Sequence, residues 1–584
     1  MGGMEVKRKH TVSLCMIVKN EEKFLTRCLK SMEGIVDEIV IIDTGSTDGT
    51  VEVAKSFNAK VDYFQWNQNF SDARNKSLSL ATKDWIIVLD ADEYLRLEDR
   101  DKLIEALNDF SYDGYIIKTL NFNGGDNNTS YITNLNQRIF KNNQNFMYRG
   151  AIHEQVVNVE SQVMGQGFKI IDVGFYHSGY LDSVVKNKNK VNRNLSILEK
   201  VAEEEPDNMF TLFNLANEYS QKGDQEKALE LYNRAYDLKK YGVGFMPKLV
   251  VFRLLCLMGL KRNEEALVAI KEGLSIYPDY TELVYYRGTL ERQAGQITKA
   301  IESFETCLKM GKPRAEIEFQ KMCYEFGPLY NLAEINQAQS EFEKAIQFYN
   351  KALAADSSKF QIVYAICDCL MSLNFESVAI YQMLAKYFNL SVVTNQVVFI
   401  NLLIEKGFYQ EAQTALLSCS ELSTHHQLIF LRAKAEFYLG NYDLARELFL
   451  SYSNMGDIKG SQPYLFVSNI LKPFELTFEW DSYYISLQHY LLEDTALTPP
   501  EAKDFIEILI RLMNEFNLIH KQEYFDKLTE LVFQFQEYET RLNFARFFEQ
   551  RGYLELARSL IFRTIQEQGD CCQEMAELLV RTYR

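Results

Sequence analysis

The 584-residue chain has few of the features that mark disordered, disulfide-linked or membrane-spanning proteins. Its 9 prolines leave little room for extended disordered linkers. It has no apolar run of about 18 residues or more, and residues 1–10 lack the apolar core of a signal peptide. The 10 cysteines do not have the spacing of a zinc site. We therefore expect free thiols, no transmembrane segment and a cytoplasmic location.

Positive charge is also scarce. The chain has 63 Lys and Arg against 80 Asp and Glu, a formal net charge of −17 at pH 7. A protein that wraps nucleic acid needs a surface rich in Lys and Arg, so nucleic acid is not an expected partner. A small anionic ligand needs only a few local cations and is not excluded. The length exceeds what one hydrophobic core usually serves, so we expect two or more domains.

Short apolar runs alternate with amphipathic segments from Thr11 to about Tyr180, which predicts an α/β domain with a mostly parallel sheet. In such sheets the ligand binds beyond the carboxyl ends of the strands. Candidate ligand-binding residues lie at these ends, and they are Asn20, Asp43, Asp90 and Asp92. The predicted strands are 12–18, 38–42, 61–66 and 85–89, and the predicted helices end near residues 32, 57 and 81.

From about Pro206 the pattern changes to paired helices. Small residues recur at the start of the second helix of each pair, and in four pairs another small residue lies twelve positions earlier. Two of the intervals, 34 and 33 residues, match the period of about 34 typical of tetratricopeptide repeats. The second-helix positions are Ala228, Ala266, Ala300, Ala345, Ala412, Ala445 and Ala557, and the first-helix positions are Gly288, Ala333, Ala433 and Ala545.

The sequence therefore predicts an α/β domain over residues 1–200 and an all-α superhelical domain over residues 201–584. The second domain could divide into sub-arrays of about 201–390 and 391–584. Stacked repeats form a concave face that can hold an extended peptide or another protein. The alternative is that the repeats only join two copies of the chain into a homodimer, and we weigh the two interpretations about equally.

The pair Asp90 and Asp92 is the strongest single motif. Two carboxylates two positions apart can converge on one cation when a strand bends into a loop, and oxygen ligands suit Mg²⁺ or Mn²⁺ bound to a pyrophosphate. Most isolated pairs of this kind are loop caps. Here a second motif supports a ligand site, because Ser71 is a plausible helix N-cap that would place Arg74 in the first helical turn.

A cation at a helix N-terminus is unfavourable unless an anion is bound there as well. Arg74 is therefore a candidate anion ligand. The alternative is a surface arginine paired with Asp72 or Asp48.

Four segments, in their order and spacing, resemble the family 2 glycosyltransferases of the GT-A fold. Among these, the chain is most similar to enzymes fused to tetratricopeptide-like repeats that glycosylate bacteriocin peptides of the sublancin type. The resemblance implies a Rossmann-like catalytic domain that transfers a sugar from a nucleotide-sugar, a UDP-sugar being expected, with inversion at the anomeric carbon. The segments are 14–22, 43–50, 70–75 and 89–93, and segments 138–140, 148–154 and 176–180 also match this subgroup.

The resemblance also implies roles for particular residues. The strand-end loops would hold the base and ribose, Arg74 would contact the nucleotide, and Asp92 would bind the metal on the diphosphate. Asp90 would bind the ribose or the metal. Many family members have two acidic residues where this chain has Asp43 and Thr44, so the base contact there differs. The complete nucleotide-sugar set is Val18, Asn20, Glu21, Asp43, Ser46, Arg74, Asp90, Ala91 and Arg138.

An inverting transfer needs a base that deprotonates the acceptor as it attacks. Glu154 is the candidate, and His153 would position the substrate. His177 would complete the metal shell, although a histidine before a Ser-Gly turn is more often structural. Arg138 and Arg149 are alternative cations for the diphosphate, with surface ion pairs as the competing interpretation.

Three functions remain open at this point. The first is glycosylation of a peptide or protein side chain held by the repeats. The second is synthesis of a surface polysaccharide or lipid-linked glycan, but a membrane acceptor favours a basic docking segment and residues 186–193 form only a modest one. The third is a repeat adaptor without activity. The intact set of Asp90, Asp92, Arg74 and Glu154 argues against this third function.

Overall fold

The computed structural model forms two compact units, Met1–Ile362 and Val363–Arg584. We describe each unit by itself. The described residues are 8–122, 131–142, 145–160, 167–177, 184–240, 244–314, 317–422, 424–456, 458–474, 480–493, 495–569 and 572–583, and the side chains of residues 121, 122, 131–133, 177, 184–191 and 458 lie outside the description.

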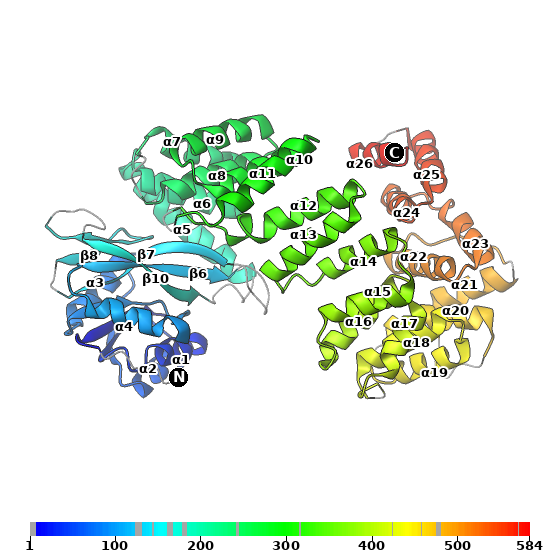
Figure 1. Cartoon of the computed structure of the whole chain (residues 1–584), viewed down its shortest axis with the longest axis horizontal. Coiled ribbons are helices and arrows are strands. Elements are labelled where there is room, and N and C mark those ends of the chain that lie inside the picture. The colour runs from blue at the N-terminus through cyan, green and yellow to red at the C-terminus, as the bar shows by residue number, and fades with distance from the viewer. Residues whose placement is uncertain are drawn as a thin grey trace. The chain divides into compact units, whose positions relative to one another are not determined.

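The first unit is built on an eight-stranded sheet of order β3-β2-β1-β4-β7-β6-β10-β5 (Figure 1). Strands β1 to β4 are parallel to one another, whereas β7 is antiparallel to both β4 and β6. Strand β10 is parallel to β6, and β5 closes the edge antiparallel to β10. The strands are β1 (Val12–Val18), β2 (Glu38–Asp43), β3 (Lys60–Tyr63), β4 (Trp85–Val88), β5 (Glu93–Leu95), β6 (Gly114–Phe122), β7 (Tyr131–Lys141) and β10 (Phe168–His177).

Helices cover both faces of this sheet, as the alternating pattern predicts. Along β1, Leu14 and Met16 pack with α1 (Glu22–Ser31), α2 (Thr50–Ser56) and α4 (Arg100–Asn108). Cys15 points to the other face, which is covered by α3 (Phe70–Leu80) and by the hairpin of β8 (Phe146–Arg149) and β9 (Gln155–Asn158). Successive strand residues point to opposite faces, so a fully apolar strand fills both cores. The expected α/β fold class is confirmed.

One local expectation is wrong. Ser71 is not the N-cap of α3, because the helix begins at Phe70 and the side chain of Asn69 accepts the N–H of Asp72. Asn is at least as good a cap as Ser and lies two residues earlier. Arg74 therefore lies in the second turn of α3. The Ser71 hydroxyl instead donates a hydrogen bond to the carbonyl of Gly150, at 2.6 Å.

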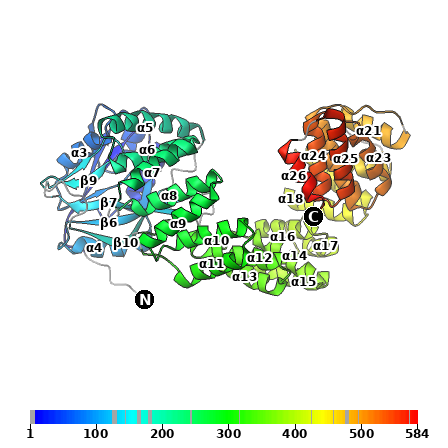
Figure 2. The ribbon, with the colours of Figure 1, turned by 90° about the horizontal axis from the view of Figure 1, so that it is seen from above.

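Helical repeats follow the sheet within the first unit. Strand β10 ends at His177 and α5 begins at Val184, before the predicted boundary at residues 200 and 201. Figures 1 and 2 show β6, β7 and β10 between α4 and the repeat helices α5–α7. These helices are α5 (Val184–Glu204), α6 (Met209–Lys222), α7 (Gln225–Asp237), α8 (Met246–Gly259), α9 (Asn263–Ile276), α10 (Thr281–Gln293), α11 (Ile297–Met310), α12 (Phe326–Ala338) and α13 (Phe342–Ala355).

The second unit is also helical. Its helices pack as consecutive pairs, such as α18 with α19 and α24 with α25. They are α14 (Ile362–Ser372), which begins at the last residue of the first unit, α15 (Ser377–Leu384), α16 (Val393–Glu405), α17 (Tyr409–Leu417), α18 (His426–Tyr438), α19 (Tyr442–Ser453), α20 (Ile458–Leu471), α21 (Ser482–Glu493), α22 (Lys503–Leu518), α23 (Gln522–Val532), α24 (Tyr538–Gln550), α25 (Leu554–Gln568) and α26 (Gln573–Arg581).

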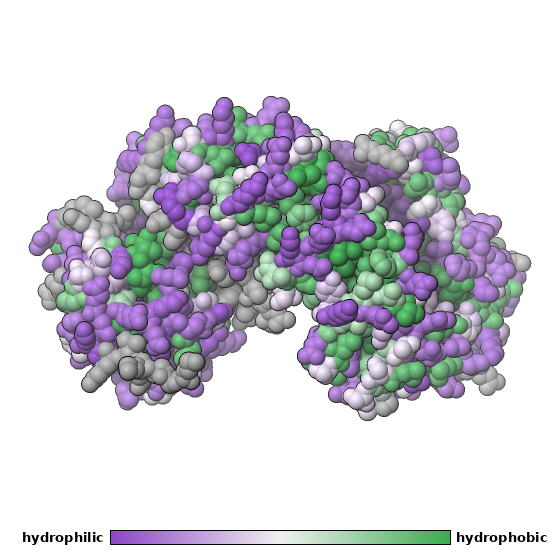
Figure 3. All heavy atoms as spheres, viewed as in Figure 1, coloured by the Kyte–Doolittle hydropathy of each residue, from purple (hydrophilic) through white to green (hydrophobic). Residues whose placement is uncertain are grey.

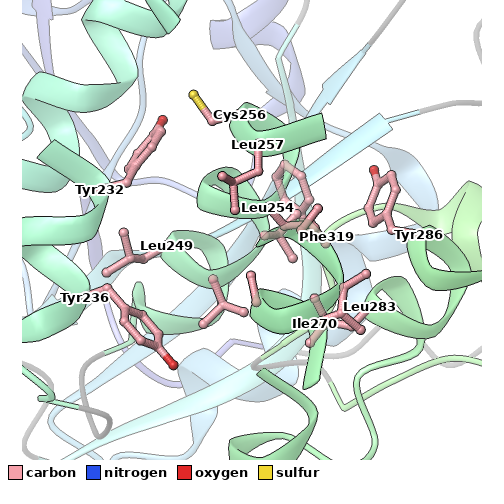
Figure 4. Packing of buried hydrophobic residues seen from close by; sticks show 14 of the residues in the cluster. Tyr232, Tyr236, Leu249, Leu254, Cys256, Leu257, Ile270, Leu283, Tyr286 and Phe319 are labelled. Atoms are coloured by element: carbon pink, nitrogen blue, oxygen red, sulfur yellow. The ribbon is translucent and has the colours of Figure 1, made fainter. Parts of the chain in front are cut away.

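The small residues of the repeat pattern lie where helices approach most closely. All seven second-helix alanines have 0% of their surface exposed. A Cβ added at Gly288 of α10 would come within 3.0 Å of Phe304 on α11. Larger residues fill the spaces between pairs, and Figure 4 shows Tyr232 from α7 and Leu249 from α8 in this core.

Polar contacts join the first repeats to the sheet. Lys248 of α8 donates a hydrogen bond from Nζ to Asn134 of β7, and burial lowers the pKa of Lys248 to about 8. Glu318 lies with its carboxylate 3.7 Å from the Nζ of Lys118 on β6, and Tyr324 donates to it at 2.7 Å. These contacts explain why one compact unit contains both the sheet and the first repeats.

The face of the molecule drawn in Figure 3 is mainly polar. Figure 3 shows hydrophilic residues over most of the visible face, with hydrophobic residues in smaller patches between them. Among the described residues, none of the helices combines the length and the apolar character that a membrane crossing requires.

The repeat packing can be tested at Gly288. Gly288→Leu should lower the denaturation midpoint and the unfolding free energy by about 2 kcal/mol, because the added atoms must displace Phe304. Ala294→Leu, at an exposed position at the end of the same helix, serves as the matched control. An unchanged midpoint in Gly288→Leu would show that the close approach is not required.

Candidate functional site

The loops after β1 and β2 are fastened to each other. The Asn20 amide oxygen accepts the N–H of Thr47 at 2.7 Å, and the Asn20 N–H donates to the Ser46 hydroxyl at 3.0 Å. Asp43, which is buried, accepts the N–H groups of Gly45 and Ser46 at 2.9 and 3.0 Å. Asn20 has a φ of 57°, a left-handed conformation that asparagine tolerates better than most residues. The predicted nucleotide-binding loops therefore form one rigid edge.

Val18 and Glu21 belong to this edge through their backbone atoms. The carbonyl of Val18 accepts the Thr44 N–H at 3.0 Å, and the Glu21 N–H donates to the Thr50 hydroxyl at 2.8 Å. Thr44 thus has a structural role at the position where an acidic residue was expected. The side chains of Asp43 and Asn20 are already engaged in holding the loops together.

Asp90, directly beyond β4, lies between two guanidinium groups. Its Oδ1 accepts from Arg74 and its Oδ2 from Arg138, each at 2.8 Å. Burial opposes ionisation of Asp90, but the charges of Arg138 and Arg74 outweigh it and hold the pKa of Asp90 well below its usual range. Arg138 also donates to Glu93 at 2.8 Å. Arg138 is therefore part of an internal network and does not form a surface ion pair.

Glu154 joins the network through Arg74. The Nε of Arg74 donates to Glu154 Oε1, so that one guanidinium bridges Glu154 and Asp90. Arg74 is buried, and it pairs with neither of the alternatives, Asp72 and Asp48. Burial disfavours its charge, but Asp90 and Glu154 raise the pKa of Arg74 well above its ordinary value.

The network contains buried polar atoms whose bonding capacity is unused. Among the described residues no hydrogen-bond partner exists for Arg74 Nη1, Arg138 Nε or the Tyr148 hydroxyl. The Tyr148 ring centre lies 5.4 Å from the Arg74 guanidinium, and burial raises the pKa of Tyr148 to about 12. An unsatisfied buried donor costs about 1 to 3 kcal/mol. An anionic ligand that accepts from these donors would recover that cost.

Two members of the network were given no role by the sequence. Glu93 lies inside the acidic segment but is 2% exposed, and its Oε2 accepts the Asp90 N–H at 2.9 Å. Tyr148 lies next to Arg149 in a segment that matches the family. Both residues lie in segments that match the family, and this position could have marked them as candidates. Their contacts with Arg138 and Arg74 could not be predicted, because these arginines are distant in the sequence.

The predicted metal ligands are only partly described. Ala91 is buried. Burial, followed by the negative charges of Glu93, Asp90 and Asp92, raises the pKa of the Cys28 thiol, so Asp92 lies near this cysteine. The side chain of His177 lies outside the described residues. Within the described part of the chain, no group of three or more His, Cys, Asp or Glu side chains could hold a metal ion. The metal site therefore stays a prediction.

His153 lies in the loop between β8 and β9, with a φ of 53°. Its Nε2 is 3.7 Å from Glu218 on α6, so this residue reaches from the loop 150–154 to the first repeat. Its predicted role in positioning the substrate stays a prediction. Arg149 is exposed, and Arg138 is the arginine that enters the network.

The network predicts a pH-dependent stability. Asp90→Asn should lower the unfolding free energy at pH 7 by about 2 kcal/mol, since two buried guanidinium groups lose a shared carboxylate that is itself only 36% exposed. A carboxyl with a lowered pKa stabilises the fold above its unfolded pKa near 4, so the difference from wild type should shrink as the pH falls below about 4.

The matched control is Asp62→Asn, which breaks an exposed pair with Lys76 and should leave the melting temperature unchanged. Melting temperatures measured between pH 3 and pH 8 test both variants. An Asp90→Asn protein as stable as wild type at pH 7 would contradict the shared-carboxylate arrangement.

Comparison with known proteins agrees with this geometry. Residues 13–171 match the glycosyl transferase family 2 model, and residues 211–241 and 327–359 match a tetratricopeptide repeat model. The chain is 29% identical to the SPbeta prophage-derived glycosyltransferase SunS of Bacillus subtilis, over 49% of this chain and 66% of SunS. It is 30% identical to an uncharacterized glycosyltransferase of Rickettsia typhi, over 31% of this chain and 64% of that one.

A solved structure, that of S. aureus TarS, is 16% identical, with a TM-score of 0.26 over 46% of this chain and 55% of that chain. Of the sequence relatives, the chain spans just under two thirds of the length of SunS and of the Rickettsia typhi protein. The matched family region contains β1 to β4 and the whole arginine–carboxylate network. The chain therefore carries a glycosyl transferase family 2 domain followed by tetratricopeptide repeats.

Proposed function

We propose that this protein transfers a sugar from a nucleotide-sugar, a UDP-sugar being expected, to a peptide or protein side chain, with inversion at the anomeric carbon. The observation that carries the proposal is the pair of buried guanidinium groups at the carboxyl edge of β4 within a family 2 domain. Their unused donors, Arg74 Nη1 and Arg138 Nε, suit the oxygens of a diphosphate.

The charge of the site supports a divalent cation as part of the donor complex. Two guanidinium groups face three carboxylates, those of Asp90, Glu93 and Glu154, so the network already carries a net charge of −1. A diphosphate would add further negative charge in a buried place. Asp92 with Asp90 would hold Mg²⁺ or Mn²⁺ through oxygen ligands, and the ion would stabilise the charge on the departing nucleoside diphosphate.

The acceptor side depends on Glu154. One of its oxygens is held by Arg74, which orients the carboxylate toward the donor edge and leaves Oε2 to take a proton from the acceptor as the acceptor attacks. A thiol acceptor would need less help, because its pKa lies nearer neutrality than that of a hydroxyl. The nucleophile can thus be oxygen or sulfur with the same arrangement.

The repeats and the similarity to SunS support a peptide or protein acceptor. A glycan or lipid-linked acceptor is the competing function, and it predicts transfer without any contribution from the repeats. A homodimer formed through the repeats is compatible with either acceptor.

Donor hydrolysis tests the catalytic domain. Purified protein with Mg²⁺ or Mn²⁺ should slowly hydrolyse one donor from a panel of UDP- and GDP-sugars, and EDTA should stop the reaction. Asp92→Ala should lower the rate by about 100-fold, because charge on the leaving group is no longer stabilised. Asp101→Ala, an exposed position on α4, is the control. Full activity in Asp92→Ala would remove Asp92 from the metal site.

A shortened chain tests which unit binds the acceptor. A cut near residue 205 would remove α6 and its contact with His153, so the cut belongs after Ile362, where the first compact unit ends. Residues 1–362 should keep donor hydrolysis, whereas transfer to Cys- or Ser-containing peptides should fall if the second unit holds the peptide. Equal transfer by both forms would locate acceptor binding in the first unit.

A further inference from the structure

The five-residue loop that carries Glu154 joins β8 to β9 and is held on one side by α3. The carbonyl of Gly150 accepts from the Ser71 hydroxyl at 2.6 Å, and the carbonyl of Ala151 accepts the Phe70 N–H at 2.9 Å. Glu154 itself pairs with Arg74 of the same helix. Both ends of the loop are therefore fixed by the catalytic domain.

The middle of the loop is held by the repeats. Ile152 packs against the hydrophobic core of the first repeats, and His153 Nε2 lies 3.7 Å from Glu218 Oε1 on α6. His153 has a φ of 53°, in the left-handed region that histidine enters more readily than most non-glycine residues. The residue next to the candidate base is therefore held by a side chain from the repeat region.

Glu218 is poorly explained by helix packing alone. It is 3% exposed, it accepts from Asn194 of α5 at 2.8 Å, and its Oε2 has no hydrogen-bond partner among the described residues. Burial of a carboxylate is unfavourable, and an apolar side chain of similar size would pack between helices without that penalty. Besides the hydrogen bond with Asn194, the carboxylate offers an electrostatic contact with His153, whose Nε2 lies 3.7 Å from Oε1.

A second contact comes from the same corner of the first repeat. Arg193, adjacent to Asn194, lies with its guanidinium 5.5 Å from the ring centre of Phe70, the first residue of α3. The elements α5 and α6 thus touch both the loop 150–154 and the beginning of the helix that carries Arg74. This corner is the one place among the described contacts where repeat side chains reach residues next to Glu154.

We propose that Glu218 is a positioning residue for the transfer reaction. Through His153 it holds the loop 150–154 so that Glu154 stays paired with Arg74 at the donor edge. The first repeat is then a working part of the catalytic site. This inference rests on the proposed function for its kinetic consequence, but its structural consequence can be measured without any activity.

The test uses the full-length chain. Glu218→Leu removes the contact with little change in volume, and Glu218→Gln keeps an acceptor for Asn194 and for the imidazole. Glu436→Leu is the matched control, since Glu436 is also buried on the first helix of a repeat and also accepts from side-chain amides, those of Gln413 and Asn441. It lies in the second unit.

Hydrogen exchange followed by mass spectrometry is the first readout. Peptides covering 146–158 should exchange about fivefold faster in Glu218→Leu, with most of the protection restored in Glu218→Gln and none lost in Glu436→Leu. Exchange of this segment at the wild-type rate in Glu218→Leu would overturn the proposal. So would faster exchange in Glu436→Leu by the same factor, because that would indicate a general loss of stability.

Donor hydrolysis is the second readout. Glu218→Leu should lower kcat about tenfold while KM for the donor stays within twofold, because the donor edge is built by other residues and only the base is displaced. His153→Ala combined with Glu218→Leu should be no slower than His153→Ala alone. If the wild-type protein hydrolyses a donor and Glu218→Leu has an unchanged kcat, the positioning role of Glu218 is overturned. If the wild-type protein hydrolyses no donor, the proposed function is overturned, and the hydrogen-exchange result alone decides the role of Glu218.

Discussion

The sharing of one carboxylate by two guanidinium groups is the interaction on which the site depends. Arg74 and Arg138 are buried side by side, and without Asp90 between them their charges would repel one another in a medium of low dielectric constant. Asp90 in turn stays ionised because both arginines hold it. Each member is therefore stable only in the presence of the others. Glu93 and Glu154 extend the same arrangement to two further elements of the fold.

The strand order of the sheet brings these residues together. Ile87 of β4 is paired with Ile139 of β7 in antiparallel register, so Arg138 lies one residue further toward the carboxyl end of β4. That is the end from which Asp90 follows. Strand β7, inserted antiparallel between β4 and β6, thus delivers the second arginine.

Local pattern predicted the strands β1 to β4, the acidic pair after β4 and the small residues of the repeats, because each depends on neighbours in sequence. The cap of α3 was misplaced by two residues, since Asn69 and Ser71 are both good caps and only tertiary contacts decide between them. The pairing of β7 with β4, the burial of Glu93 and the reach of Glu218 to His153 follow from contacts across 45 to 65 residues. No periodicity in the sequence carries that information.

The junction between the sheet and the first repeats includes several polar contacts, and these bear on what the repeats do. A helical array that only served as a tether would need no buried carboxylate or lysine at its contact with the catalytic domain. Here Lys248 bonds to Asn134, Glu318 faces Lys118, and Glu218 faces His153. The Lys248–Asn134 hydrogen bond depends on direction as well as distance, whereas the other two contacts, each 3.7 Å long, are electrostatic. The position of Glu154 is consequently set by α3 from one side and by the first repeat from the other, and a change in that repeat reaches the candidate base through the loop 150–154.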